Sequence, residues 1–332
     1  MPTEAQVREK LEEVIVPGVM CSLARLNLIC QIAISDVRVN VTLASTALNS
    51  EIQEWLKNKI SEVIGKLSDV KEVQTDFIEM KIPDINEIGS VIAIMSGKGG
   101  VGKSLVTGLT GLSLARQGYD VGILDADITG PSIPKMFGIS SRPVGSETGI
   151  MPVLSKAGIE IMSINLLLPN EDDAVIWRGP LIGNTIKQFW EEVVWGKLDY
   201  LIVDLPPGTA DASLTVMQTL PLSGVIIVFS PQELAAMVVR KTVQMSQKMN
   251  IPILGVVENM SYFTLPDTGK KIELFGKSRA EEMVKSAGAP LLAQIPIDPA
   301  LAQHCDDGNI ESYDSEIVQG YADKLSQVLK PK

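Results

Sequence analysis

Short runs of apolar residues, each of strand length, recur along the chain from residue 91 onward. They are rich in valine, isoleucine and leucine and are near-continuous, as in strands buried on both faces of a sheet. The runs are 91–95, 121–125, 200–204, 224–229, 253–257 and 291–295. Helical periodicity fills several intervals, for example 232–249 and 278–287, the latter with a Ser278…Glu281 capping box. This alternation predicts an α/β fold with a doubly wound, mostly parallel sheet.

The first 80 residues have a different pattern, in which helical and alternating stretches are mixed. Apolar and polar residues alternate in two neighbouring runs, as expected of strands with one solvated face. We expect a helix over 3–15, strands over 26–34 and 37–43, a helix that begins at Asn49 or Ser50, and a last strand between Val70 and Met80. This order predicts a small α+β domain over residues 1–80.

Residues 81–90 follow neither periodicity and combine Pro83, Gly89 and polar side chains, which is typical of a linker. The sequence therefore predicts three parts. They are the small α+β domain at 1–80, the linker at 81–90 and the α/β domain at 91–332.

The composition is that of a globular protein with a sizeable core, since 45% of the 332 residues are hydrophobic and 21% are charged. A net charge of −11 argues against a nucleic-acid-binding surface. Neither a transmembrane stretch nor a secretory signal is recognisable, so a membrane role is not expected. The three cysteines, Cys21, Cys30 and Cys305, are widely spaced, which fits a reducing compartment. We expect a cytoplasmic protein.

One glycine-rich run joins the first strand of the α/β domain to a helix. The run Gly97–Ser104 (GKGGVGKS) follows the apolar residues 91–95, and Leu105, Leu109 and Leu112 continue it with helical spacing. A strand, a glycine-rich loop and a helix in this order form the context that a phosphate-binding loop requires. The sequence therefore predicts a nucleotide site at this loop.

The residue types of this loop assign the expected roles. The glycines let main-chain N–H groups curl around phosphate oxygens, and the start of the helix adds its positive dipole end. Lys103 is expected to reach the β- and γ-phosphates of ATP, and the Ser104 hydroxyl to bind Mg²⁺. The predicted nucleotide-binding residues of the loop are Gly97, Lys98, Gly99, Gly100, Val101, Gly102, Lys103 and Ser104.

Aspartates follow two of the predicted strands at the edge where the loop lies. Asp204 ends the run 200–204 and is expected to hold Mg²⁺, directly or through water. Asp125 ends the run 121–125, and Asp127 follows it on a loop. We expect Asp127 to position the attacking water, which together with Lys103 makes the chain an ATP hydrolase.

Lys98 is an unusual residue for such a loop, because a phosphate-binding loop does not require a lysine directly after its first glycine. One interpretation is a solvated loop lysine. The other is a second cation that reaches the developing charge on the γ-phosphate, as an arginine finger does, from a partner subunit. Spacing alone leaves both open.

The loop resembles the signature-lysine phosphate loop of the MinD/ParA/nitrogenase-iron-protein class of ATPases. Within that class, further segments resemble the Mrp/ApbC family of iron–sulfur cluster carriers. They are Asp125–Lys135 (DADITGPSIPK), Trp177–Pro180 (WRGP), Trp195–Tyr200 (WGKLDY), Asp204–Asp211 (DLPPGTAD), Glu258–Phe263 (ENMSYF) and Ile295–Pro299 (IPIDP). The first 80 residues resemble, more faintly, the small iron–sulfur assembly domain that often precedes this ATPase.

The resemblance implies a homodimeric ATPase that binds an iron–sulfur cluster between its subunits and passes it to apoprotein clients or to other assembly proteins. It implies that Lys98, which with Lys103 and Asp127 makes up the catalytic set, crosses to the partner's nucleotide. It also implies that Asn259 contacts the adenine. ATP and Mg²⁺ are the cofactors it implies, with a cluster as cargo.

The chain departs from the family at the cluster site. Where the family has a Cys-Pro-x-Cys pair, this chain has Leu265 and Thr268. Neither side chain offers the thiolate that an iron–sulfur cluster requires. A four-cysteine site built from Cys21 and Cys305 of two subunits is an alternative, but no spacing supports it.

Two other functions remain to be weighed. One is a MinD/ParA-like switch that positions a partner on membrane or DNA. The C-terminal pattern Ile317, Tyr321, Leu325, Val328 is amphipathic enough for membrane contact, although a helix packed on its own sheet also explains it. The other is an adaptor that binds nucleotide without hydrolysis, against which Lys103, Asp127 and Asp204 argue.

Overall fold

The computed structural model describes residues 2–127, 130–168, 179–208 and 211–329. The chain forms two compact units. The smaller unit is made of Met1–Ile88, Arg142–Leu154 and Gln188–Leu198, and the larger of Gly89–Ser141, Ser155–Lys187 and Asp199–Lys332.

The smaller unit has the α+β elements that the sequence predicts. Its sheet has the order β1-β2-β3, with β1 and β2 antiparallel and β2 and β3 parallel. Thr3 and Gln6 form a capping box before α1, and Asn49 caps α2. The elements are α1 (Glu4–Glu12), β1 (Ile29–Ser35), β2 (Arg38–Ala44), α2 (Ser50–Ile64) and β3 (Glu72–Ile78).

The predicted continuous boundary at residue 80 needs a correction, because the smaller unit also takes two later segments of the chain. The side chain of Asn86 bonds to the second of them, Gln188–Leu198: its Nδ2 donates to Val193 O at 2.9 Å, and its Oδ1 accepts from Trp195 N at 2.8 Å. The Thr148 hydroxyl accepts from Ala47 N at 3.0 Å. The first segment, Arg142–Leu154, holds the short strands β6 (Gly145–Ser146), β7 (Gly149–Ile150) and β8 (Val153–Leu154).

The predicted linker at 81–90 is also wrong, because it forms regular structure. Residues Ile82–Ile85 form the short helix α3, with Ile82 and Ile85 buried, and β4 (Glu87–Ser96) begins directly after it. Pro83 favoured the linker prediction, but a proline is well tolerated in the first turn of a helix, which is where Pro83 lies in α3.

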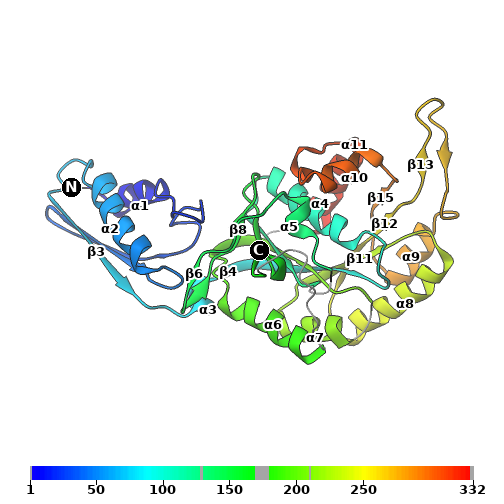
Figure 1. Ribbon diagram of the computed structural model, residues 1–332, viewed down its shortest axis with the longest axis horizontal. Coiled ribbons are helices and arrows are strands. Elements are labelled where there is room, and N and C mark those ends of the chain that lie inside the picture. Colours follow the sequence, from blue (N-terminus) through cyan, green and yellow to red (C-terminus); the bar gives the residue numbers. More distant parts are fainter. Residues whose placement is uncertain (1, 128–129, 169–178, 209–210, 330–332) are drawn as a thin grey trace. The chain divides into compact units, whose positions relative to one another are not determined.

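The larger unit contains the parallel sheet, whose strands lie in the order β15-β12-β11-β4-β10-β5-β9 (Figure 1). The paired strands run parallel. All six predicted strands are present, whereas β9 (Glu160–Ser163) was missed because its four residues include polar ones at both ends. The other strands are β5 (Val121–Asp125), β10 (Lys197–Asp204), β11 (Gly224–Phe229), β12 (Ile253–Asn259) and β15 (Leu291–Ile295).

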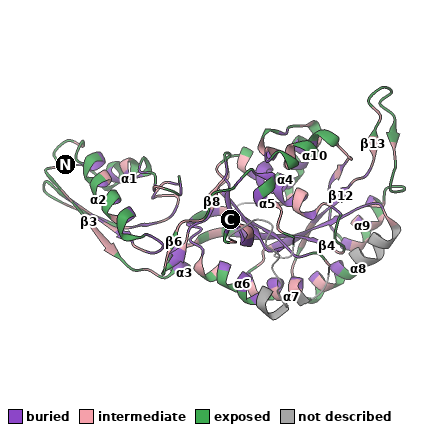
Figure 2. Ribbon diagram, viewed as in Figure 1, coloured by how far each residue is buried: buried purple, intermediate pink, exposed green. Residues whose placement is uncertain are grey.

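Helices cover both faces of this sheet, which confirms the doubly wound α/β fold (Figure 1). Figure 2 shows the strands between them as the buried part of the unit. Helices α4, α5, α10 and α11 lie on one side, and α7, α8 and α9 on the other. The helices are α4 (Lys103–Arg116), α5 (Ile133–Met136), α6 (Gly179–Glu192), α7 (Asp211–Thr219), α8 (Glu233–Lys248), α9 (Ala280–Ala287), α10 (Pro299–Asp306) and α11 (Glu316–Val328).

The expected capping box at Ser278 is absent, because α9 begins one residue later than the sequence pattern predicts. Arg279 is the N-cap residue and makes no side-chain cap bond. The Ser278 hydroxyl is instead directed to the buried carboxylate of Glu258, 2.7 Å away.

The apolar side of the amphipathic C-terminal helix α11 packs against its own domain and is not exposed. Val318, Tyr321 and Leu325 of α11 are buried, and the Tyr321 hydroxyl lies 2.7 Å from Thr110 Oγ1 of α4. Burial raises the pKa of Tyr321 well above its usual range. The packing alternative for this helix is therefore confirmed. Nowhere in the described ranges is a helix both long and apolar enough to cross a membrane.

Candidate functional site

The glycine-rich loop leaves β4 and turns into α4 through two residues in the left-handed region. Gly100 has φ +80° and Gly102 has φ +82°, and Gly102 is the N-cap of α4. A Cβ at Gly102 would overlap the side-chain nitrogen of Asn259. In the described part of the chain, the N–H groups of Gly99 and Gly100 have no main-chain acceptor. Such a row of N–H groups before a helix start is a binding site for phosphate oxygens.

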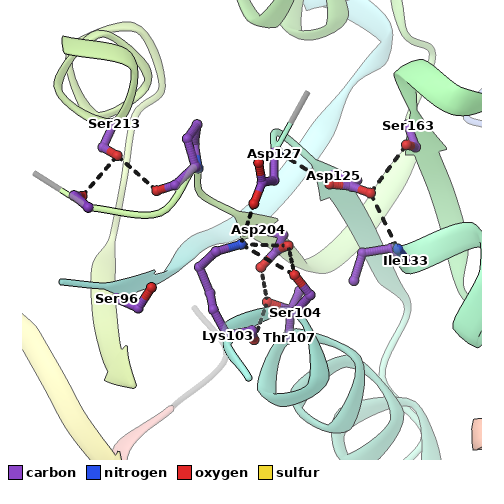
Figure 3. Close-up of polar contacts among 12 residues, drawn as sticks. Ser96, Lys103, Ser104, Thr107, Asp125, Asp127, Ile133, Ser163, Asp204 and Ser213 are labelled. Carbon is purple, nitrogen blue, oxygen red and sulfur yellow. Dashed lines mark hydrogen bonds and ion pairs between the residues drawn. The ribbon is translucent and has the colours of Figure 1, made fainter. Parts of the chain in front are cut away.

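Lys103, the first residue of α4, is a buried cation. Its side chain is 5% exposed, and its Nζ lies 2.7 Å from Asp204 Oδ2 and 3.5 Å from Asp127 Oδ2 (Figure 3). Asp204 ends β10 and is fully buried. A buried charge of either sign is tolerated only when it is paired. The structure thus brings together the three charged residues that the sequence placed at this site.

Two hydroxyl groups of α4 complete the surroundings of Asp204. Ser104 Oγ donates to Asp204 Oδ2 at 2.5 Å, and Thr107 Oγ1 donates to Asp204 Oδ1 at 2.6 Å (Figure 3). Residues three apart share one face of a helix, which places both hydroxyls on the same carboxylate. Hydroxyl and carboxylate oxygens are the ligands that Mg²⁺ prefers, so Ser104 and Asp204 fit this ion.

Sequence reasoning missed Thr107. The available signal was a threonine three residues after Ser104, on the same face of the predicted helix, because a buried hydroxyl needs a partner.

Asp125 organises the loop that follows β5. Its Oδ1 accepts from Asp127 N at 3.2 Å, and its Oδ2 accepts from Ile133 N at 3.3 Å and from Ser163 Oγ at 3.2 Å (Figure 3). Complete burial, and to a smaller extent the negative charge of Asp204, raises the pKa of Asp125 to about 8. Asp125 therefore holds the main chain of Asp127 while the Asp127 side chain faces Lys103. Ser163 of β9 was missed because that strand was missed.

The segment after β10 is tied to the start of the glycine-rich loop. Gly208 N donates to Ser96 O at 2.9 Å. Ser213 Oγ donates to Pro206 O at 2.9 Å and to Gly208 O at 3.1 Å. A shift of either loop must therefore move the other. Thr209 and Ala210 of this motif, like Trp177 and Arg178 of another, lie outside the described residues.

Asn259 ends β12 and lies against the glycine-rich loop. It is 2% exposed, and its Nδ2 donates to Val101 O at 2.9 Å. Its expected contact with adenine stays a prediction. Lys98 is exposed, and its carbonyl accepts from Ser96 Oγ at 3.0 Å, while the role of its side chain also stays a prediction.

The positions of the missing cysteines lie in an exposed hairpin formed by β13 (Phe263–Thr264) and β14 (Lys271–Ile272). Gly269 N donates to Leu265 O at 2.9 Å, which closes the turn, and neither Leu265 nor Thr268 offers a thiol. Among the residues that the structure describes, no three His, Cys, Asp or Glu side chains gather as a metal site.

The cysteines of the chain do not supply the missing ligands. Cys21 is 2% exposed and packs in the core of the smaller unit, which contradicts its use in a four-cysteine site shared between subunits. Burial, and to a smaller extent the negative charge of Asp306, raises the pKa of Cys305 to about 11, which disfavours a thiolate. Burial also raises the pKa of Cys30.

Comparison with known proteins places this site in context. The family model described as ParA, NUBPL iron-transfer P-loop NTPase, matches residues 87–329. The iron–sulfur cluster carrier protein of Aquifex aeolicus is 35% identical over 99% of this chain and 98% of its own length. The iron–sulfur cluster carrier protein of Clostridium perfringens is 45% identical over 69% of this chain and 83% of its own length.

Solved structures show the same relationship. The nucleotide-binding protein of Archaeoglobus fulgidus, in complex with ADP, is 44% identical, with a TM-score of 0.64 over 71% of this chain and 93% of that one. The MinC:MinD cell division complex of Aquifex aeolicus is 21% identical, with a TM-score of 0.53 over 73% of this chain and 98% of that one. The latter similarity shows a shared fold.

Replacing Gly102 with alanine tests the loop geometry. The added Cβ meets the Asn259 amide, and a left-handed conformation costs a non-glycine residue about 1–2 kcal/mol, so ADP affinity should fall about 10-fold or more. Isothermal titration calorimetry measures it. Gly320→Ala, where nothing lies within 4 Å of the new Cβ, is the matched control and should bind ADP as the wild type does. Unchanged affinity of Gly102→Ala would contradict this geometry.

Proposed function

The chain belongs to the family of NUBPL iron-transfer P-loop NTPases, and from this premise we propose that it is an Mg²⁺-dependent ATPase that acts in iron–sulfur cluster assembly or transfer. The observation that carries the proposal is the group of charged and hydroxyl side chains at the start of α4. Lys103 Nζ and Ser104 Oγ lie 2.7 and 2.5 Å from Asp204 Oδ2, next to a loop in which Gly99 and Gly100 have no main-chain acceptor among the described residues.

Each residue of this group of side chains has a distinct task in ATP hydrolysis. The loop N–H groups bind the phosphate oxygens, and Lys103 exchanges Asp204 for the β- and γ-phosphates. Ser104 and Asp204 would hold Mg²⁺, and this ion would supply positive charge to neutralise the phosphate oxygens. Thr107 keeps Asp204 oriented while Lys103 leaves it, since its hydroxyl remains on the other carboxylate oxygen.

Asp127 orients the attacking water. Its support is its place on the loop after β5, with its Oδ2 3.5 Å from Lys103 Nζ and its main chain held by Asp125. A carboxylate beside the phosphate-binding lysine is suitably placed to accept a hydrogen bond from water near the γ-phosphate.

The active form is a homodimer in which Lys98 of one subunit reaches the nucleotide of the other. The support is that Lys98 lies in the phosphate loop with an exposed side chain, whereas Lys103 of the same loop is buried on Asp204. A cation supplied by a second subunit stabilises the transition state as an arginine finger does.

The iron–sulfur cluster is the cargo of the system, and its thiolate ligands come from partner proteins. The support is chemical: Leu265 and Thr268 have no thiol, Cys21 is buried, and the Cys305 thiol is held protonated. Partners are apoprotein clients or assembly proteins that carry cysteines. The smaller unit remains predicted to be an iron–sulfur assembly-type domain.

A MinD/ParA-like switch on membrane or DNA is the weaker candidate. Similarity to MinD at 21% identity supports the fold alone. The apolar side of α11, which a membrane would need, is buried against α4.

Mixing two inactive variants tests the composite site. Lys98→Ala and Asp127→Asn should each lose ATP turnover about 10³-fold or more while still binding ATP. In an equimolar mixture, half of the dimers are mixed and one of their two sites is intact, so about a quarter of wild-type turnover should return. No recovery from two inactive variants would mean that Lys98 acts within its own subunit, which would contradict the composite site. Lys277→Ala, at an exposed lysine outside the loop, is the control and should keep full turnover.

Anaerobic reconstitution with iron and sulfide tests the assignment of the cluster as cargo. The purified chain should stay colourless, because it presents no set of thiolates. Visible absorbance and iron content are the measurements. A brown holoprotein that is lost on Cys305→Ala would contradict the assignment and make the chain a carrier in its own right.

A further inference from the structure

The segment Tyr262–Lys277, here called the arm, leaves the body of the larger unit between β12 and α9. It contains the β13–β14 hairpin, which extends away from the sheet (Figure 1) and is largely exposed (Figure 2). Leu274 is 57% exposed and Phe275 is 38% exposed. An element with so few buried contacts must be held at its two ends.

One buried carboxylate joins both ends of the arm. Glu258 of β12 is fully buried, and its Oε2 accepts from Ser261 Oγ at 3.1 Å, where the chain enters the arm. The same Oε2 accepts from Ser278 Oγ at 2.7 Å, and Oε1 accepts from Arg279 N at 2.7 Å, where the chain leaves it. Gln294 of β15 donates to Glu258 Oε2 at 2.8 Å.

The next residue along β12 contacts the phosphate loop. Asn259 donates to Val101 O, and consecutive side chains of a strand point to opposite faces of the sheet. Glu258 and Asn259 therefore place the arm and the loop on the two sides of one strand end. Movement of Val101 as the loop closes on phosphates must shift this strand end or break the Asn259 bond.

The turn between these contacts is strained. Met260 has φ +57°, a left-handed conformation that costs a non-glycine residue about 1–2 kcal/mol. It brings Ser261 back to Glu258, where Ser261 Oγ also donates to Glu258 O at 3.0 Å. A strained residue persists where its neighbours determine it, and such residues concentrate at functional sites.

We propose that Glu258 is a positioning residue that clasps the arm to β12 and, through Asn259, couples the arm to nucleotide binding at the phosphate loop. A nucleotide that orders the loop strengthens the Asn259 contact, steadies the end of β12 and tightens the clasp. The inference rests on the proposed nucleotide site and assigns it a second output at the arm.

Limited trypsinolysis after Lys270 and Lys271, at the tip of the arm, tests this coupling. Cleavage requires local opening of the hairpin, so ADP should slow it at least about fivefold in the wild type, a typical coupling between two sites. In Glu258→Gln, cleavage should be faster and the same with and without ADP. A purely structural role would raise the rate but leave the ratio with and without ADP unchanged.

Two further variants keep the test decisive. Ser278→Ala removes one bond of the clasp and should reduce the ADP effect without abolishing it. Glu281→Gln changes an exposed carboxylate in the first turn of α9 and should behave as the wild type does. Calorimetry with ADP separates the failures. If the wild type does not bind ADP, the proposed function is contradicted. If the wild type binds ADP but the cleavage rate in the arm does not change, or if Glu258→Gln keeps the full ADP effect on cleavage, the coupling alone is overturned.

Discussion

The buried ion pair between Lys103 and Asp204 is the interaction on which the rest of the site depends. Each charge would be costly in the interior without the other, and Asp204 also needs the hydroxyls of Ser104 and Thr107. The pair can form only because β4 lies beside β10, so that the helix after one strand faces the end of the other. The parallel order of the sheet thereby determines the chemistry at its edge.

The same arrangement explains how the loop can respond to a nucleotide. Lys103 is not fixed by packing alone; it is held by a carboxylate that phosphate oxygens can replace. Its neighbours are connected in turn: Gly208 bonds to Ser96, and Asn259 bonds to Val101. The loop is therefore connected to the segment after β10, through Gly208, and to the end of β12, which leads to Glu258 and the arm.

Sequence reasoning found the parts of this fold that local physics determines. Buried parallel strands are near-continuous apolar runs, and a phosphate loop needs a fixed spacing of glycines, so both could be predicted. Ser163 and Glu258 could not, because their importance depends on partners far away in the chain. For Thr107 the sequence shows that a buried hydroxyl needs a partner, but not that the partner is Asp204. The linker at 81–90 was wrong for a related reason: Asn86 is ordered by Val193 and Trp195. A pattern within ten residues carries no information on such contacts.

The contrast between the complete nucleotide site and the absent thiol ligands separates two roles that the family name combines. In this chain, the residues proposed to bind and hydrolyse ATP lie together at the start of α4, while the hairpin turn where the family has its cysteine pair contains Leu265 and Thr268. The chain is therefore the proposed ATP-dependent component, and partner proteins hold the cluster.

The most direct test of this account is steady-state ATP hydrolysis by the wild type and by Lys103→Ala, each with Mg²⁺ and with chelator. Turnover by the wild type is expected to require Mg²⁺ and to be lost in Lys103→Ala. Equal turnover by both proteins, or none by a wild type that binds ATP, would contradict it.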